Sequence, residues 1–245
     1  MFKHILNNID MKKIFHPADK RGYNDIGWLK AKFSFSFGPY YDPEKIHFGA
    51  LRVLNDDIIG RGRGFGAHPH DNMEIITIVL DGALEHKDSM GNVGIIKAGE
   101  VQVMSAGTGI THSEYNPLRD KDTSSLQIWV FPKEQNIKPR YDQKSFTDAL
   151  KLNELITLVS PDRHSEALWI NQDATFSMGE FEAEKRIKYD IKTLGNGAYF
   201  FLLEGSVEID GTTLNKRDAL GVYDTSSVTI ETVAHSRLLI LEVPM

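Results

Sequence analysis

Two short motifs in the first half of the chain combine side chains that bind transition metals. The first contains His68 and His70, separated by a proline, and the second contains His112 and Glu114, separated by a serine. In a β-strand, residues i and i+2 project from the same face, so each motif can direct both of its side chains toward one point. One His-x-His motif is also typical of two exposed histidines. The second motif completes a set of three imidazoles and one carboxylate and therefore favours a metal site.

The composition limits which metals such a site can bind. The chain has no cysteine, which excludes disulfides, iron–sulfur clusters and thiolate zinc sites. Three nitrogen ligands and one oxygen ligand suit Fe(II), Mn(II), Co(II), Ni(II), Cu(II) and Zn(II). One divalent transition metal ion per chain is expected, with Fe(II) as the first choice and the other five as alternatives.

A further carboxylate, Glu74, follows the first motif. It would share the inward face of His68 and His70 if one strand ran through all three residues without a bulge. Two roles remain open for it. A hydrogen bond from Glu74 to a ligand imidazole is favoured over direct coordination, because carboxylates commonly orient metal-bound histidines in this way.

The remaining histidines and the aromatic residues give weaker signals. Six histidines stand alone in the sequence and are expected to be structural or solvated: His4, His16, His47, His86, His164 and His235. Several aromatic residues are expected in the core, with a subset lining the mouth of a barrel, where they could enclose a flat aromatic substrate: Phe33, Phe35, Phe37, Phe48 and Trp129.

The elements that must position these motifs are short strands. Runs rich in Val, Ile, Phe, Tyr and Thr, bounded by glycine-containing turns, occupy 32–37, 47–53, 74–80, 94–96, 101–104 and 126–131. This spacing predicts an all-β sandwich or barrel and is not typical of alternating strands and helices.

The chain of 245 residues is long enough for two domains. The first is expected over 1–132 with the metal site. A polar, proline-containing linker with a short helix at 146–150 is expected over 133–150, and the second domain over 151–245. Part of the stretch before Trp28 is expected to pair with the second domain.

The second half repeats the first in outline. The segment 199–203 and the following Gly205 correspond to 76–80 and Gly82. With these glycines aligned, Ile191 and Thr193 stand where the first half has His68 and His70. The second copy is therefore expected to lack metal ligands.

The residues around both motifs resemble the pirin family within the cupins. Gly62 precedes the spacing His68-x-His70-x3-Glu74, and a run from Ser105 to Gly109 leads into the second motif. From Trp28 to the end the chain is similar to bacterial pirin-like quercetin 2,3-dioxygenases. The resemblance implies a bicupin, in which two antiparallel β-barrel (jelly-roll) domains pack face to face. It also implies Glu114 as the fourth ligand, because pirins have a glutamate two residues after the last histidine.

The resemblance further implies an activity. A metal-dependent dioxygenase would cleave a flavonol-like substrate with O2, so its partners would be a small aromatic molecule and O2, and Glu114 would double as the catalytic base. The alternative is a non-catalytic, metal-binding, redox-sensing or regulatory module that interacts with another protein. The residues Asp71-Asn72 stand where the eukaryotic co-regulators usually have Arg-Gly, which weakens that alternative.

Charge and hydropathy exclude other classes of ligand. The formal net charge of −6 offers no basic patch for phosphates, so direct nucleic-acid binding is not expected. Residues 1–10 lack the apolar core of a secretory signal, and the longest uncharged apolar run, 75–80, is far too short to cross a membrane. A cytoplasmic protein without membrane contact is expected.

Overall fold

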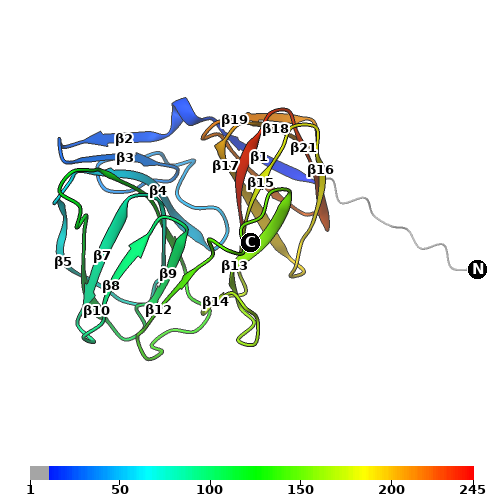
Figure 1. Cartoon of the computed structure of the whole chain (residues 1–245). Helices are drawn as coiled ribbons and strands as arrows, with labels where there is room; N and C mark the ends of the chain where they lie inside the picture. The colour runs from blue at the N-terminus through cyan, green and yellow to red at the C-terminus, as the bar shows by residue number, and fades with distance from the viewer. Residues whose placement is uncertain (1–10) are drawn as a thin grey trace, which may run out of the picture.

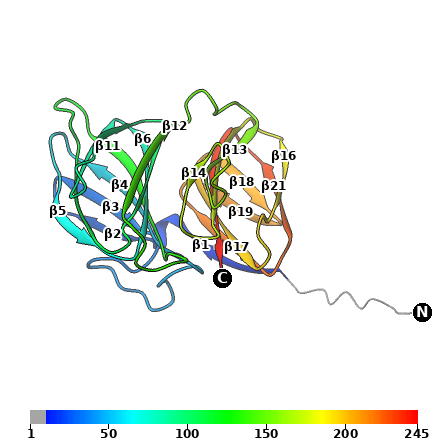
Figure 2. The same cartoon turned by 90° about the horizontal axis from the view of Figure 1, so that it is seen from below.

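The computed structural model describes residues 11–245, which form four β-sheets (Figure 1). Each domain consists of a seven-stranded sheet and a four-stranded sheet, and the two domains lie side by side (Figure 2). The only helical element in residues 11–245 is the 3-10 turn η1 (Ala18–Lys20). Within that range no helix is long and apolar enough to span a membrane. His4 lies outside the described residues.

The first domain contains the two predicted metal-binding motifs. Its large sheet has the order β12-β9-β6-β11-β4-β3-β2, from β2 (Gly22–Asp25), β3 (Leu29–Phe33), β4 (Leu51–Ile59), β6 (Glu74–Asp81), β9 (Glu100–Ser105), β11 (Thr123–Val130) and β12 (Arg140–Ser145). Its small sheet has the order β5-β10-β7-β8, from β5 (Gly64–His70), β7 (Ala83–Asp88), β8 (Val93–Lys97) and β10 (Ile110–Tyr115).

The second domain has the same two-sheet plan. Its large sheet has the order β1-β20-β17-β22-β15-β13-β14, from β1 (Lys12–His16), β13 (Glu154–Ser160), β14 (Leu168–Trp169), β15 (Thr175–Phe181), β17 (Asn196–Glu204), β20 (Ala219–Tyr223) and β22 (Ser236–Pro244). Its small sheet has the order β16-β21-β18-β19, from β16 (Arg186–Asp190), β18 (Ser206–Ile209), β19 (Thr212–Asn215) and β21 (Ser227–Thr232). All paired strands are antiparallel except β13 and β14.

The apolar run in β6 follows from its position between two layers. Ile75 and Val79 are buried on the face toward the interior of the first domain, whereas Ile76 and Ile78 are buried on the face toward the second domain. A strand covered on both faces reads as a continuous apolar segment. The edge-proximal β3 instead alternates buried apolar residues with exposed lysines, since only one of its faces is covered.

The two large sheets pack against each other, and one apolar cluster spans both domains. Its members include Leu126, Ile128 and Val130 from the first domain and Phe176, Phe201, Leu239 and Leu241 from the second. The predicted all-β bicupin, with two domains packed face to face, is confirmed.

The path of the chain differs from a simple division into two halves. β1 pairs antiparallel with β20 in the second domain, as expected for the stretch before Trp28, and appears in Figure 1 as a blue strand among the yellow and red ones. β12 lies within the expected linker 133–150 but pairs with β9 at the edge of the first domain's large sheet.

Two local predictions were wrong. Residues 146–150 form one turn, in which the backbone N–H groups of Ala149 and Leu150 donate to the Phe146 carbonyl, instead of a helix. The strands expected over 32–37 and 47–53 lie elsewhere, because β3 ends at Phe33 and β4 runs from Leu51 to Ile59, which leaves residues 34–50 outside both strands. The intervening chain contains two prolines and two glycines with positive φ, which interrupt regular pairing.

Candidate metal centre

Three imidazoles converge at the small sheet of the first domain. β10 pairs with β5 so that His112 lies opposite His68 and Ile110 opposite His70. The ring centroids are 4.4 Å apart for His68 and His112, and 4.9 Å apart for the other two pairs. One nitrogen of each ring lies within 4.8 Å of the others. The structure therefore brings the three predicted histidines together in the geometry of a ligand set.

The state of these imidazoles suits a divalent cation. His68 Nδ1 lies 2.8 Å from the Gly66 carbonyl, which acts as an acceptor and so leaves the His68 Nε2 lone pair free. Burial lowers the pKa of His70 to about 4 and that of His112 to about 2, with further lowering from the neighbouring imidazoles. His112 Nε2 is buried and has no hydrogen-bond partner. Neutral rings and one orphaned buried nitrogen fit a metal ion.

Glu114 lies on the same face of β10, two residues after His112, and is fully buried. Gln127 Nε2 donates to both carboxylate oxygens at 3.0 and 2.8 Å, and Thr77 Oγ1 donates to Oε1 at 3.3 Å. Burial raises the pKa of Glu114, and the Gln127 hydrogen bonds oppose that increase. Glu114 lines the same cavity as His68 and His70. The ring nitrogens that lie within 4.8 Å of its carboxylate as part of a cluster, however, belong to His112 and His86.

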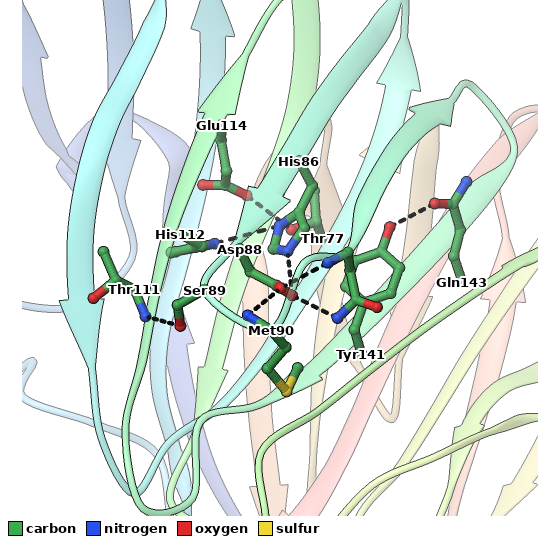
Figure 3. A network of polar contacts seen from close by, with 11 residues as sticks. Thr77, His86, Asp88, Ser89, Met90, Thr111, His112, Glu114, Tyr141 and Gln143 are labelled. Carbon is green, nitrogen blue, oxygen red and sulfur yellow. Dashed lines mark hydrogen bonds and ion pairs between the residues drawn. The ribbon is translucent and has the colours of Figure 1, made fainter.

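His86 is a site residue that its isolated place in the sequence did not reveal. It is completely buried on β7, opposite Glu114 in the strand register, and Asp88 lies opposite His112 (Figure 3). His86 Nδ1 is 3.4 Å from His112 Nδ1. The spacing of His86 and Asp88 is again i, i+2, the same signal that marks the two recognised motifs.

Glu74 does not have either of the roles expected for it. Its Oε2 accepts hydrogen bonds from Ser105 Oγ at 2.8 Å and from the backbone N–H of Asn171 at 3.1 Å. The expectation was wrong because β5 ends at His70 and β6 begins at Glu74 in the other sheet, so the three residues do not share one strand. Burial raises the pKa of Glu74 to about 7.

A cavity of about 450 Å³ opens beside the histidines. Four aromatic side chains line it together with three polar side chains of the large sheet: Trp28, Phe37, Phe65 and Trp129, with Asn55, Asp57 and Gln127. The Oδ1 atoms of Asn55 and Asp57 are buried without a hydrogen-bond partner. Burial raises the pKa of Asp57 to about 8, and the charges of Asp56 and Glu114 add to this increase.

Only two of the five aromatic residues considered in the sequence analysis line this cavity. Phe37 and Trp129 line it, and Trp129 packs edge-on against His70 with the ring centroids 4.8 Å apart. Phe33 lies in the interior core of the first domain, whereas Phe35 and Phe48 belong to the cluster between the domains.

The second domain has no equivalent group of ligands within residues 11–245. Its interior is filled by apolar side chains, including Tyr189, Phe200, Leu214 and Ile230. Glu242, its fully buried carboxylate, accepts hydrogen bonds from Tyr189 Oη and from the backbone N–H groups of Lys192 and Thr193. These donors give it a structural role.

Comparisons with known proteins agree with this architecture. The pirin family model matches residues 15–130, and the model of the quercetinase C-terminal cupin domain matches residues 157–243. A protein of Escherichia coli K12 named quercetin 2,3-dioxygenase is 40% identical over 237 residues, covering 93% of this chain and 96% of that protein. A pirin-like protein of Caulobacter vibrioides is 42% identical over 227 residues, covering 92% of this chain and 97% of that protein.

A solved structure agrees as well. Bacterial pirin YhhW from Escherichia coli in complex with nickel(II) superposes with a TM-score of 0.90 at 38% identity, covering 95% of this chain and 99% of that one. Because 95% of this chain is covered, the match extends over both domains. The chain therefore belongs to the pirin family of bicupins.

Proposed function

We propose that the protein is a metal-dependent dioxygenase that cleaves a flavonol-like substrate with O2. The observation that carries the proposal is the convergence of three imidazoles, one with an orphaned buried nitrogen, beside a cavity lined by aromatic side chains. His68, His70, His112 and Glu114 would hold the ion. Fe(II) is the first candidate, and Ni(II), Mn(II), Co(II), Cu(II) and Zn(II) have compatible ligand preferences.

The protein would act through binding and proton transfer. When bound, a divalent ion supplies a Lewis acid that favours the deprotonated form of a substrate enol hydroxyl. Glu114 would take that proton, and its raised pKa supports this role because it makes the carboxylate a better base near neutral pH than an exposed one. Gln127 holds both oxygens of Glu114 in a fixed orientation.

The cavity supports a flat aromatic substrate with hydroxyl groups. Rings at the walls, among them Phe65 and Trp129, suit stacking and edge contacts. The unpartnered oxygens of Asn55 and Asp57, which line the cavity, would accept hydrogen bonds from hydroxyl groups of the substrate. The names of relatives such as the quercetin 2,3-dioxygenase of Escherichia coli support the same substrate class.

The test compares Glu114→Ala with Glu74→Ala in metal-loaded protein. We expect Glu114→Ala to bind metal weakly and to lose flavonol cleavage even with metal in excess, since the missing group takes part in the chemistry. Glu74→Ala should bind metal and turn over like the wild type, because its carboxylate bonds elsewhere. Activity is followed as loss of flavonol absorbance under O2, in parallel with metal content.

Two results would contradict the proposal. Full activity in metal-saturated Glu114→Ala would remove Glu114 from the reaction. A wild type that is inactive with every first-row metal would favour a regulatory module in place of an enzyme.

A further inference from the structure

A buried chain of polar contacts runs from Asp88 through His86 to His112 (Figure 3). His86 Nε2 is 3.2 Å from Asp88 Oδ2, and His86 Nδ1 is 3.4 Å from His112 Nδ1. The side chains of His86 and Asp88 are completely buried. At the far end of the chain, His112 Nε2 is buried without a hydrogen-bond partner, and one nitrogen of the His112 ring lies within 4.8 Å of a nitrogen of His68 and of His70.

Asp88 is held as an acceptor on both oxygens. Its Oδ1 accepts the backbone N–H groups of Met90 at 2.9 Å and Asn92 at 3.0 Å, and its Oδ2 accepts the Asn92 side-chain amide at 2.9 Å. Burial acts to raise the pKa of Asp88, but hydrogen bonds from Asn92, His86 and Met90 outweigh it and leave the pKa below its ordinary value. An ionised carboxylate only accepts, so His86 Nε2 must carry the hydrogen.

We infer that His86 and Asp88 are positioning residues that fix the tautomer of His112 so that its Nε2 lone pair is available to the metal. A neutral imidazole with its hydrogen on Nε2 has an acceptor at Nδ1. His86 Nδ1 therefore requires a donor, and the atom facing it is His112 Nδ1. With its hydrogen on Nδ1, His112 is left with an unprotonated Nε2.

The same contacts decide how the cluster of His86, His112 and Glu114 should be interpreted. Both nitrogens of His86 are engaged, one by Asp88 and one by His112, so His86 has no lone pair left for an ion. The cluster is therefore not a second metal site. The inference rests on the proposed metal site of the first domain, but it is independent of the substrate and of the reaction.

Asp88→Asn should reverse the tautomers. The two backbone N–H groups that bind Oδ1 keep the amide oxygen of the new side chain in that position, so its NH2 group takes the place of Oδ2. That NH2 group then donates to His86 Nε2 and places the His86 hydrogen on Nδ1. His112 Nδ1 becomes the acceptor, and the hydrogen on its Nε2 blocks the metal.

The experiment measures tautomers and affinity separately. In metal-free, 15N-histidine-labelled protein at pH 8, imidazole nitrogen shifts report which nitrogen of His112 is protonated, with His112→Gln to assign the signal. Competition with a chelator gives the Ni(II) affinity, and thermal unfolding shows that each variant is folded. The matched control is Asn92→Ala, which removes a different hydrogen bond to the same Asp88 oxygen and keeps the carboxylate.

We expect the Nδ1–H form of His112 in the wild type and in Asn92→Ala. Asp88→Asn should give the Nε2–H form and bind Ni(II) about 10- to 100-fold more weakly. An Nε2–H form of His112 in the wild type would overturn the inference whatever the variants show. A folded Asp88→Asn with the wild-type tautomer and affinity would do the same. Weak Ni(II) binding by wild type with the expected tautomer would contradict the proposed function alone.

Discussion

At the scale of residues, the buried carboxylates of the first domain differ in what donates to them. Glu114 accepts hydrogen bonds from the side-chain amide of Gln127 and lies near the imidazoles of the metal centre. Glu74 accepts one hydrogen bond from the Ser105 hydroxyl of its own domain and one from the backbone N–H of Asn171 in the second domain. The Oε1 atom of Glu74 has no partner. Glu74 therefore belongs to the contact between the domains, and its charge is poorly compensated there.

Glu74→Gln should make the protein more resistant to unfolding above neutral pH. The folded pKa of Glu74 is about 7, above its ordinary value of 4.5, so the folded state binds more protons than the unfolded state between these values. Its contribution to stability is thus present below pH 4.5 and is lost as pH rises through 7. Between pH 5 and pH 8, the free energy of unfolding of the variant should rise relative to that of the wild type by on the order of 2–3 kcal/mol.

The measurement is urea unfolding of metal-free protein at both pH values. Glu44→Gln is the control, since Glu44 is exposed. An equal difference between Glu74→Gln and wild type at pH 5 and pH 8 would contradict the assignment.

Sequence reasoning found the histidines of the two motifs and missed His86. His68, His70 and His112 were predictable because strand geometry converts i, i+2 spacing into a shared face. His86 was not, because its relation to His112 depends on the register between β7 and β10, which the local sequence does not contain. Glu74 was misjudged because the break between β5 and β6 was not visible as a glycine or a charge run.

At the scale of elements, β1 carries a histidine into the second domain's large sheet. His16 is buried against Phe35 and Tyr199, and its Nδ1 lies 2.8 Å from the Tyr199 hydroxyl. Burial, with a smaller effect from the charge of Lys45, lowers the pKa of His16 to about 4. The docking of this strand is therefore sensitive to acid.

His16→Gln should reduce the loss of stability at acidic pH. The unfolded state takes up a proton at the ordinary pKa of 6.5 and the folded state only near 4, so the wild type loses stability as pH falls between these values. The variant lacks this pH-dependent loss of stability, which for a buried histidine is on the order of 3 kcal/mol in the free energy of unfolding. Urea unfolding at pH 7 and pH 4.5 measures it, with exposed His47→Gln as control. Parallel pH profiles for wild type and His16→Gln would rule out this role for His16.

Strands were predictable from sequence where both faces are covered. The apolar run in β6 could be read directly, because burial on two faces leaves no polar alternation to obscure it. β12 has no buried residue and alternates weakly, so its polar sequence resembled a linker. β12 forms a strand because it pairs with β9, and the local sequence of β12 does not specify that pairing.

At the scale of the whole molecule, a loop of the first domain is fastened to the end of the second. The backbone N–H of Ala50 donates to the Pro244 carbonyl at 2.8 Å, next to Gly49 with φ +51°. A Cβ atom on Gly49 would overlap that carbonyl. This contact joins β22 to the chain just before β4.

Gly49→Ala should destabilise the protein much more than Gly38→Ala. Both glycines have positive φ, which costs an alanine about 1–2 kcal/mol, but a Cβ atom on Gly38 would meet open space. The added overlap at Gly49 should bring the loss to at least about 3 kcal/mol. Thermal unfolding of both variants beside the wild type makes the comparison. Equal losses would mean that the loop yields without disturbing the contact between domains.

The position of β1 also has a consequence for the time course of synthesis. Lys12 pairs with Tyr223 and His16 with Ala219, so a strand made early waits for a partner that is translated roughly 200 residues later. At about 5–20 residues per second, that interval lasts roughly 10–40 s. The first domain can assemble its own sheets in the meantime, but β1 stays unpaired on the ribosome. Within residues 11–245, the first strand to be synthesised is thus among the last to find its partner. The second domain's large sheet can add β1 beside β20 only when translation is nearly complete.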